Sequence, residues 1–241
     1  MNSSSPIRIL IHGASGRMGQ ALLRLARENP ALQVVAAVSR SGAAIDGVDV
    51  PMFASADLAR CPSFDVAIDF SLPEGFDAVL AACKMRKAAL VSGTTGLSTQ
   101  QREALAQAAH TIPVLWASNF SLGVVVLEEL SRRAAQALTG WDADIIESHH
   151  VHKKDAPSGT ALTLGAAVAA GRGSAPHYAS LRAGDIIGEH SVQFTGPGER
   201  IELIHRAGNR DIFARGALSA AAHLAGRPAG NHRLADLIFS D

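Results

Sequence analysis

Ile7-Arg8-Ile9-Leu10-Ile11-His12-Gly13-Ala14-Ser15-Gly16-Arg17-Met18-Gly19 is the stretch that decides the fold of this chain. Residues 7–11 are mostly apolar and β-branched, which is typical of a short buried strand. Three glycines follow at positions 13, 16 and 19, and residues 20–27 carry apolar side chains at helical spacing. The pattern predicts a strand, a glycine turn and a helix in direct succession.

This succession is the setting of a dinucleotide-binding fingerprint. The spacing is GxxGxxG and not the commoner GxGxxG, but the physical demands are the same. They are a tight turn, a backbone that comes close to a pyrophosphate, and a helix packed closely on the strand. Alone, a glycine-rich turn before a helix often only makes a turn. Its position at the start of an α/β series favours the dinucleotide site.

The alternation of strands and helices continues beyond this stretch. Strands are predicted at 33–38, 65–70, 88–91 and 112–117, and helices up to residue 87, at 99–109 and from 122 to about 138. Each predicted strand ends in small polar or glycine residues, which is where open parallel sheets bind ligands. The fold class is therefore α/β, with a Rossmann-like dinucleotide-binding domain at the N-terminal end.

The second predicted strand ends at Ser39-Arg40-Ser41, where an NAD-specific site usually carries a carboxylate for the ribose hydroxyls. Arg40 can pair with a 2′-phosphate, and no carboxylate in this stretch repels it. An ordinary surface arginine at a strand end is the alternative interpretation. Together with the glycine motif, the stretch favours NADPH, with NADH as the second cofactor.

The pattern changes in the last third of the chain. Residues 177–182, 189–195 and 200–205 predict longer strands that are joined by glycine turns without helices between them. Such meandering strands indicate a C-terminal α+β domain with a mixed, mostly antiparallel sheet. Residues 209–225 are helical again and could return to the first domain.

The segment from Glu147 to Thr160 carries the densest chemistry, with three histidines and two lysines within residues 149–154. Histidine titrates near neutrality, so such a cluster can deliver protons and hold an anionic substrate. A proline turn follows, and then Ser158 as the N-cap of an Ala/Leu-rich helix, whose free N–H groups suit a carboxylate. The segment predicts a proton donor with cations around a dianionic small molecule.

Spacing refines this prediction. His149 and Lys153 would lie roughly 13 Å apart on a straight strand. Both can reach one substrate only if the chain bends, so we predict a strand at 143–148 and a loop at 151–158. Metal binding by His150 and His152 is the alternative, but two adjacent ammonium groups would repel a dication.

Composition limits the classes of protein to consider. The chain has 241 residues, of which 47% are hydrophobic, enough for one large domain or two modest ones. Basic and acidic residues balance at 22 each, which gives no electrostatic case for nucleic acid or an anionic membrane. No run has the length of a transmembrane helix, and Met1 to Pro6 lacks the features of a signal peptide. Cys61 and Cys83 are isolated, so we expect a reducing cytoplasmic location.

Several motifs occur in one order along nearly the whole chain. They are Gly-Ala-x-Gly-Arg-Met-Gly at 13–19, Ile-Asp-Phe-Ser-x-Pro-Glu at 68–74, Gly-Thr-Thr-Gly at 93–96, Ser-Asn-Phe-Ser-x-Gly at 118–123, Glu-x-His-His-x-His-Lys-x-Asp-Ala-Pro-Ser-Gly-Thr at 147–160, Arg-Ala-Gly-Asp-Ile-Ile-Gly-Glu-His at 182–190 and Gly-Glu-Arg-Ile-Glu-Leu-x-His-Arg at 198–206. Together they resemble the 4-hydroxy-tetrahydrodipicolinate reductase family, also called dihydrodipicolinate reductase, of the bacterial diaminopimelate and lysine pathway. The motif at 147–160 is highly specific, whereas many enzymes share the glycine loop.

The resemblance implies a role for each matching position. His149 would donate a proton with the assistance of Lys153, and His150, Gly159 and Thr160 would hold the substrate carboxylates. No metal is implied. The implied cofactor-binding residues are Gly13, Ala14, Ser15, Gly16, Arg17, Met18, Arg40, Gly93, Thr94, Thr95, Ala117, Ser118, Asn119 and Phe120.

The resemblance also implies the domain organisation and assembly. Residues 1–121 and 210–241 would form the dinucleotide-binding domain, and residues 122–209 a substrate-binding domain that builds a homotetramer. Two departures stand out. Many relatives have an acidic residue where this chain has Ser39, and the connection at 171–179 is short, with His177 and Tyr178 in place of small and aliphatic residues.

The implied reaction reduces 4-hydroxy-tetrahydrodipicolinate to tetrahydrodipicolinate by hydride transfer from NAD(P)H to a conjugated cyclic imine, with protonation by a histidine. Three other hypotheses remain at this point. A redox-responsive regulator would use the His/Lys cluster as a docking surface and would need a basic DNA-binding element. A metal-dependent hydrolase or lyase would need His150 and His152 as ligands. A dehydrogenase of another small dicarboxylate or amino acid would share the cofactor site.

Overall fold

The computed structural model describes residues 5–239. The predicted outer limits of the first domain, residues 1 and 241, and most of the stretch from Met1 to Pro6 lie outside the described residues. The chain divides into two compact units. The first runs to Phe120 and resumes at Phe213, and the second is Ser121–Ile212.

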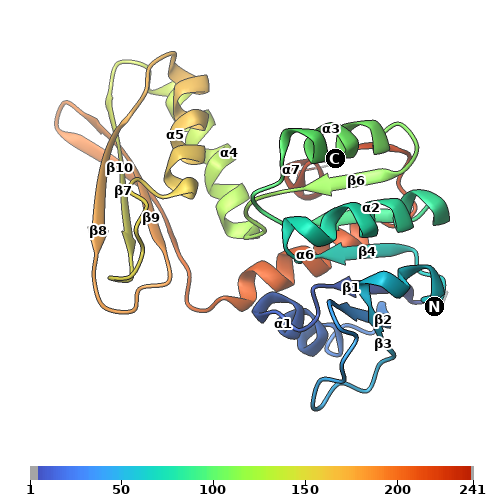
Figure 1. Cartoon of the computed structure of the whole chain (residues 1–241). Coiled ribbons are helices and arrows are strands. Elements are labelled where there is room, and N and C mark those ends of the chain that lie inside the picture. Colours follow the sequence, from blue (N-terminus) through green and yellow to red (C-terminus); the bar gives the residue numbers. More distant parts are fainter. Residues whose placement is uncertain (1–4, 240–241) are drawn as a thin grey trace. The chain divides into compact units, whose positions relative to one another are not determined.

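The first unit is built on a parallel sheet of seven strands (Figure 1). The spatial order is β11-β6-β5-β4-β1-β2-β3, so β1 lies between β2 and β4 and the order reverses there. Open α/β sheets bind ligands at such a switch point, beyond the carboxyl ends of the strands. The strands are β1 (Ile7–His12), β2 (Leu32–Ser39), β3 (Met52–Ala54), β4 (Val66–Asp69), β5 (Ala89–Ser92), β6 (Pro113–Trp116) and β11 (Gly230–Asn231).

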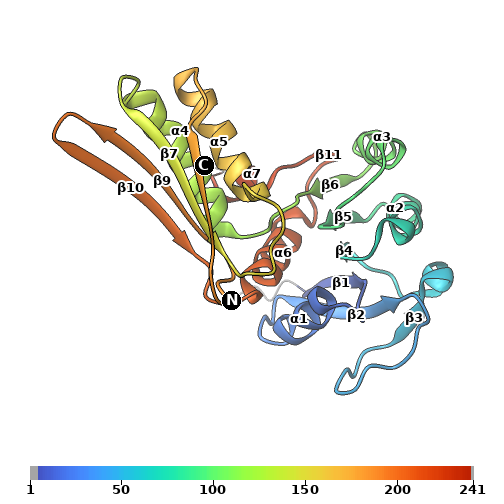
Figure 2. The same cartoon turned by 60° about the vertical axis from the view of Figure 1, so that its left-hand side comes forward.

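Helices cover both faces of this sheet, with α2 and α3 on one face and α1 and α6 on the other (Figure 2). The core on the α2 side joins Leu10, Leu90 and Val114 of the strands to Phe76 and Val79 of α2. Burial on both faces explains why these strands are mostly apolar. The helices are α1 (Arg17–Ala26), η1 (Ser55–Arg60), α2 (Pro73–Arg86), α3 (Thr99–Ala108), α6 (Asp211–Leu224) and α7 (Leu234–Ile238).

Local signals set several helix ends in this unit. Pro73 occupies the first turn of α2, and Lys87 ends that helix in the left-handed conformation. Ser98 and Gln101 form a capping box at the start of α3. One boundary differs from the prediction, because α1 begins at Arg17 and not at residue 20. Gly16, in extended conformation, is its N-cap, so the last part of the glycine motif is already helical.

The second unit is a four-stranded sheet with two helices on one face (Figure 1). Its strands are β7 (Asp142–His149), β8 (His177–Arg182), β9 (Glu189–Gly196) and β10 (Glu199–Arg206), in the order β10-β9-β7-β8. The helices are α4 (Leu122–Ala137) and α5 (Gly159–Arg172). The core between helices and sheet includes Leu127, Ile145, Leu164, Val192 and Phe194. The sheet is mixed and mostly antiparallel, as predicted.

The connectivity of this sheet corrects one expectation. A meander would place β8 beside β9, but β8 pairs with β7, and in parallel. A parallel pair needs a long crossover, and α5 is that crossover. Only β9 and β10 form a hairpin, in which Gly198 has a φ of +84°. Short segments without strong periodicity, namely β3, η1, β11 and α7, were not predicted.

Of the helices within residues 5–239, none combines the length and apolarity needed to cross a lipid bilayer.

Candidate active site

The glycine turn after β1 leaves no room for side chains at two positions. Gly13 has a φ of +82°, and a Cβ there would lie 2.5 Å from the carbonyl oxygen of Phe70. A Cβ on Gly19 would lie 2.3 Å from the carbonyl oxygen of Gly13. These are the close approaches that a dinucleotide fingerprint requires, and they bring the N-terminus of α1 against the turn. The positive end of a helix favours a phosphate at this place.

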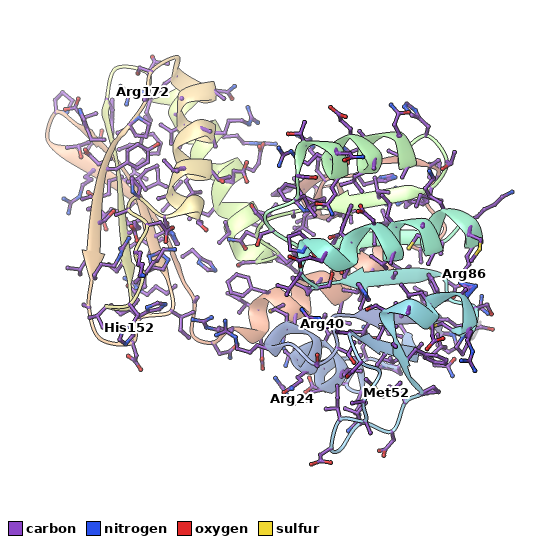
Figure 3. All side chains as sticks on the ribbon, in the orientation of Figure 1. Arg24, Arg40, Met52, Arg86, His152 and Arg172 are labelled. Carbon is purple, nitrogen blue, oxygen red and sulfur yellow. The ribbon has the colours of Figure 1, made fainter. Side chains whose placement is uncertain are left out.

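A cavity of about 600 Å³ opens at this turn, beyond the carboxyl ends of β1, β2 and β4. Of the predicted cofactor residues, Gly13, Ser15, Gly16 and Arg40 line it. Arg40 is exposed and follows β2 (Figure 3). The other lining residues are His12, Ser39, Ser55, Phe70, Ser71, Leu72, Glu74 and Gly75.

Three of the predicted glycine-loop residues do not line the cavity. Ala14 is buried, and its N–H donates to the carbonyl of Val38, so it holds the turn onto β2. Arg17 and Met18 form the first turn of α1. The cavity is therefore lined by the turn itself and by the ends of the neighbouring strands.

The other predicted cofactor segments, 93–95 and 117–120, lie next to each other after β5 and β6. Trp116 Nε1 donates to the carbonyl of Thr94 at 2.8 Å, and the N–H of Ala117 donates to the carbonyl of Ser92 at 3.1 Å. The ring of Phe70 lies 5.4 Å from that of Phe120. A Cβ on Gly93 would lie 2.2 Å from the Phe70 ring, so Phe70 separates these segments from the glycine turn.

A buried polar network joins the strand ends beneath these segments, and sequence reasoning missed it. His12 Nδ1 and Asp69 Oδ1 are 2.8 Å apart, and both side chains are almost fully buried. Asp69 Oδ2 accepts hydrogen bonds from Ser92 Oγ at 2.9 Å and Thr94 Oγ1 at 2.8 Å. Burial raises the pKa of Asp69, but the hydrogen bonds and charge of His12 outweigh it and the pKa is lowered. An ionised carboxylate therefore fixes the ends of β1, β4 and β5.

In the second unit, His149 is the last residue of β7 and is mostly buried. Its Nδ1 is hydrogen-bonded to a carboxylate oxygen of Glu147. Glu147 also accepts two hydrogen bonds from the guanidinium of Arg182, at 2.9 and 2.7 Å, and one from the N–H of Ser158 at 3.3 Å. Burial raises the pKa of Glu147, but the bonds from Arg182 and its other partners lower it to about 2. Glu147 is thus an anion inside the unit.

The environment of His149 favours its neutral form. Burial lowers its pKa, the Glu147 carboxylate opposes this, and the charges of Lys153 and Arg182 lower it again, so the net direction is downward. His190 packs edge-on against it, with ring centroids 5.2 Å apart. Burial lowers the pKa of His190 to about 4. A Cβ on Gly188 would lie 3.1 Å from His149 Nε2, so the glycine leaves space beside that nitrogen.

The predicted loop after β7 is present and bends the chain. The N–H of Lys153 donates to the carbonyl of His150 at 3.1 Å, and that of Val151 to the carbonyl of Gly184 at 3.2 Å. Lys153 Nζ lies 2.8 Å from Asp155 Oδ2. His152, in the same loop, is exposed (Figure 3), and its ring centroid is 6.2 Å from that of His150. Within residues 5–239, no three His, Cys, Asp or Glu side chains group together as metal ligands would.

The start of α5 has the predicted cap. Ser158 Oγ accepts a hydrogen bond from the N–H of Ala161 at 3.2 Å, and Gly159 and Thr160 form the first turn. Ser158 Oγ is also 3.0 Å from His190 Nε2. The helix start is therefore tied to Glu147 and to His190, both of which sequence reasoning left without a role. Glu147 had a signal, because residues two apart on a strand share a face with each other. Arg182 begins the motif at 182–190, but its contact with Glu147 had no signal, since Arg182 comes from a distant strand.

The comparisons with known proteins cover nearly the whole chain. The family described as dihydrodipicolinate reductase, N-terminus, matches residues 7–120, and its C-terminal counterpart matches residues 123–238. A relative from Stenotrophomonas maltophilia (strain R551-3), named 4-hydroxy-tetrahydrodipicolinate reductase, is 68% identical over 98% of this chain and 99% of its own. A relative of the same name from Xanthomonas campestris pv. campestris (strain B100) is 65% identical over 98% of this chain and 100% of its own.

A solved structure has the same fold. The dipicolinate-bound dihydrodipicolinate reductase from Paenisporosarcina sp. TG-14 superposes with a TM-score of 0.84 at 24% sequence identity, covering 95% of this chain and 98% of that chain. The two family matches and the curated relatives agree with the motifs along both units. The chain belongs to the dihydrodipicolinate reductase family.

Proposed function

We propose that this chain reduces 4-hydroxy-tetrahydrodipicolinate to tetrahydrodipicolinate in diaminopimelate and lysine biosynthesis, with NADPH as the preferred reductant and His149 as the proton donor. The observation that carries the proposal is His149 itself. It is a mostly buried imidazole, held through Nδ1 by an anionic Glu147, in a chain of this family. Lys153, His150, Gly159 and Thr160 complete the proposed substrate site.

The glycine turn after β1 fits a dinucleotide, because a Cβ at Gly13 or Gly19 would collide with backbone atoms. Gly13 to Met18, Arg40, Gly93 to Thr95 and Ala117 to Phe120 would hold it. When bound, the cofactor supplies a hydride to a ring carbon of the conjugated cyclic imine. The remaining steps belong to side chains of this chain.

The 4-hydroxyl group of the substrate leaves as water, which gives the conjugated imine. Hydride addition to this imine leaves an enamine-like, electron-rich centre, which then takes a proton. His149 delivers that proton from Nε2, since Nδ1 is engaged by Glu147. The lowered pKa of His149 makes it neutral at rest. A dianionic substrate favours the charged imidazolium. Binding of the two carboxylates therefore raises the pKa of His149, and the imidazole becomes protonated and can act as the acid. Lys153 stabilises negative charge that develops in the ring.

The carboxylates find complementary groups in the second unit. The first turn of α5, at Gly159 and Thr160, presents backbone N–H groups and the positive end of the helix. His150 follows His149 directly and contributes a further donor. These three residues would bind the substrate equally in ground and transition states, so they should act mainly on KM.

The preference for NADPH rests on the end of β2. Arg40 lines the cavity and can pair with a 2′-phosphate. Ser39 is buried, and its hydroxyl accepts a hydrogen bond from the N–H of Gly42 at 3.0 Å. This position therefore has no carboxylate to hold the ribose hydroxyls of NADH.

The two units would divide the work. Residues 1–121 and 210–241 would bind the dinucleotide, and residues 122–209 the substrate. The face of the second sheet opposite α4 and α5 exposes Ile146, Leu181 and Ile204, which supports its use as the contact of a homotetramer. Both cysteines are buried free thiols, which suits a cytoplasmic enzyme.

The decisive assay follows the oxidation of NADPH by absorbance, with 4-hydroxy-tetrahydrodipicolinate generated enzymatically as the second compound. We expect oxidation that depends on both compounds and on this chain. Oxidation no faster than in a mixture without this chain would reject the proposed function.

A further inference from the structure

Glu147 is a buried carboxylate that is hydrogen-bonded to His149, to Arg182 and to the N–H of Ser158. On the basis of the proposed function, we infer that Glu147 is a positioning residue. It holds His149 by Nδ1, so that Nε2 gives the proton, and Arg182 holds Glu147 in turn while ordering the loop that carries Lys153. Glu147 itself touches neither substrate nor cofactor in this assignment.

The strand geometry places Glu147 and His149 where their side chains can make contact. The two residues are two positions apart on β7, so their side chains emerge on the same face. Glu147 has 1% of its side chain exposed and His149 has 10%. A ring held by Nδ1 in such a packed place has one nitrogen left to exchange protons. The absence of a side chain at Gly188 leaves space beside that nitrogen, Nε2.

Arg182 makes the buried carboxylate tolerable. An unpaired buried charge is costly, and the double hydrogen bond from Arg182 together with the N–H of Ser158 satisfies Glu147 on both oxygens. The same guanidinium donates to the carbonyl of Asp155 at 2.6 Å and to that of Lys153 at 3.3 Å. Through one side chain, the position of Glu147 is therefore coupled to the loop of Lys153.

Four titratable side chains, each on a different element, surround His149. Glu147 lies on its own strand, Arg182 on β8, His190 on β9 and Lys153 on the loop after β7. Glu147 favours the imidazolium, whereas Arg182 and Lys153 oppose it. His190, with its pKa near 4, is neutral at the pH of the reaction. Removing Glu147 or Arg182 should therefore move the titration of His149 in opposite directions, which a general loss of packing would not do.

The experiment compares Glu147→Gln and Arg182→Gln with wild type in the full-length protein. The pKa of His149 is read from NMR of ¹³C-labelled histidine, with the resonance assigned through His149→Gln, and kcat is measured against pH. We expect Glu147→Gln to lower the pKa of His149 by about one unit and kcat by roughly 10–100-fold, with little change in KM. The decline of kcat at high pH should begin at lower pH. Arg182→Gln should raise the pKa of His149.

Glu129→Gln is the matched control. Glu129, on α4, is also a carboxylate that is paired with two arginines, Arg132 and Arg133. Its pKa is likewise lowered to about 2, but by these arginines and not by a histidine. Its replacement should leave the pKa of His149 and kcat unchanged. If Glu147→Gln fails to fold, Glu147→Asp replaces it. That variant keeps the charge but shortens the reach to Nδ1, so kcat should fall at least about tenfold.

An unchanged pKa and pH profile in Glu147→Gln, or shifts in the same direction in both variants, would overturn the inference. So would wild-type kcat in Glu147→Asp. The NMR titration needs no substrate, so it tests the contact between Glu147 and His149 even if the wild type fails to reduce 4-hydroxy-tetrahydrodipicolinate. In that case the proposed function falls, and the contact with Glu147 is judged on the titration alone.

Discussion

His149 has only Nε2 free to exchange a proton, because Glu147 engages Nδ1. Replacement by glutamine keeps the approximate size of the side chain and removes the acid. His149→Gln should lower kcat by roughly 10²–10⁴-fold, the usual contribution of a positioned acid. NADPH affinity, measured by fluorescence, should barely change, because the glycine turn and its cavity belong to the other unit. Near-normal kcat with loss of cofactor binding would instead make the histidine cluster a binding surface.

Arg40 tests the cofactor preference at the same scale. We expect a higher kcat/KM for NADPH than for NADH in wild type, and Arg40→Asp should reduce or invert the ratio, because a carboxylate repels a 2′-phosphate and can hold ribose hydroxyls. Arg60→Asp is the control, since Arg60 is an exposed arginine of the same unit that pairs with Asp57 and does not line the cavity. A wild-type preference for NADH would contradict the prediction.

What the sequence reveals about single residues depends on how local their partners are. His149 and Ser158 could be assigned from neighbours within the motif, and the cap at Ser158 is confirmed. The contact of Arg182 with Glu147 spans 35 positions, and that of His12 with Asp69 spans 57. Such pairs arise from strand order, which the local pattern does not contain. Both contacts therefore became visible only in the folded chain.

Among the elements, the strand-turn-helix of residues 7–26 was predictable because each part has a strong local signal. Its tightest point is Gly19, where an added Cβ would strike the backbone of Gly13 and Ala14. Gly19→Ala should lower stability by about 1–3 kcal/mol through overpacking. It should also weaken NADPH binding, because α1 would be displaced from the turn. Thermal unfolding and fluorescence titration measure the two effects.

Gly140→Ala is the control for this element, since nothing lies within 4 Å of the added Cβ at that position. It should leave unfolding and NADPH binding as in wild type. If Gly19→Ala behaves like Gly140→Ala, the close packing of α1 on the turn has no energetic role.

Pairing between elements was harder to predict than the elements themselves. The apolar runs locate β8, β9 and β10 to within a residue or two, but they do not say which strands are neighbours. β8 lies beside β7 because α5 returns the chain parallel to it, and a meander would have been equally compatible with the pattern. The short strands β3 and β11 were not predicted, because segments of two or three residues have no periodicity that can be recognised.

At the scale of the whole molecule, the second unit presents one covered and one open sheet face. Strand pairing puts Ile146, Leu181 and Ile204 on the open face, and each is 38% or more exposed. Apolar side chains gathered on an open sheet favour association, and a pair of such faces related by a two-fold axis would bury both. From the sequence, a D2-type homotetramer was predicted from the open strand edges expected at residues 177–205 together with the family resemblance. The exposed apolar side chains on the open face are a further physical reason to expect association.

We therefore expect a homotetramer in light scattering at micromolar concentration, and Ile146→Asp should shift it to smaller species. The charge would be buried without a partner in any assembly through this face, while the folded monomer would tolerate it in water. Met85→Asp is the control, because Met85 is 65% exposed and belongs to α2 of the first unit and not to this sheet. A wild-type monomer, or an Ile146→Asp variant that stays tetrameric with an unchanged thermal midpoint, would rule out this face as the contact. Dissociation in Met85→Asp alone would move the contact to the first unit.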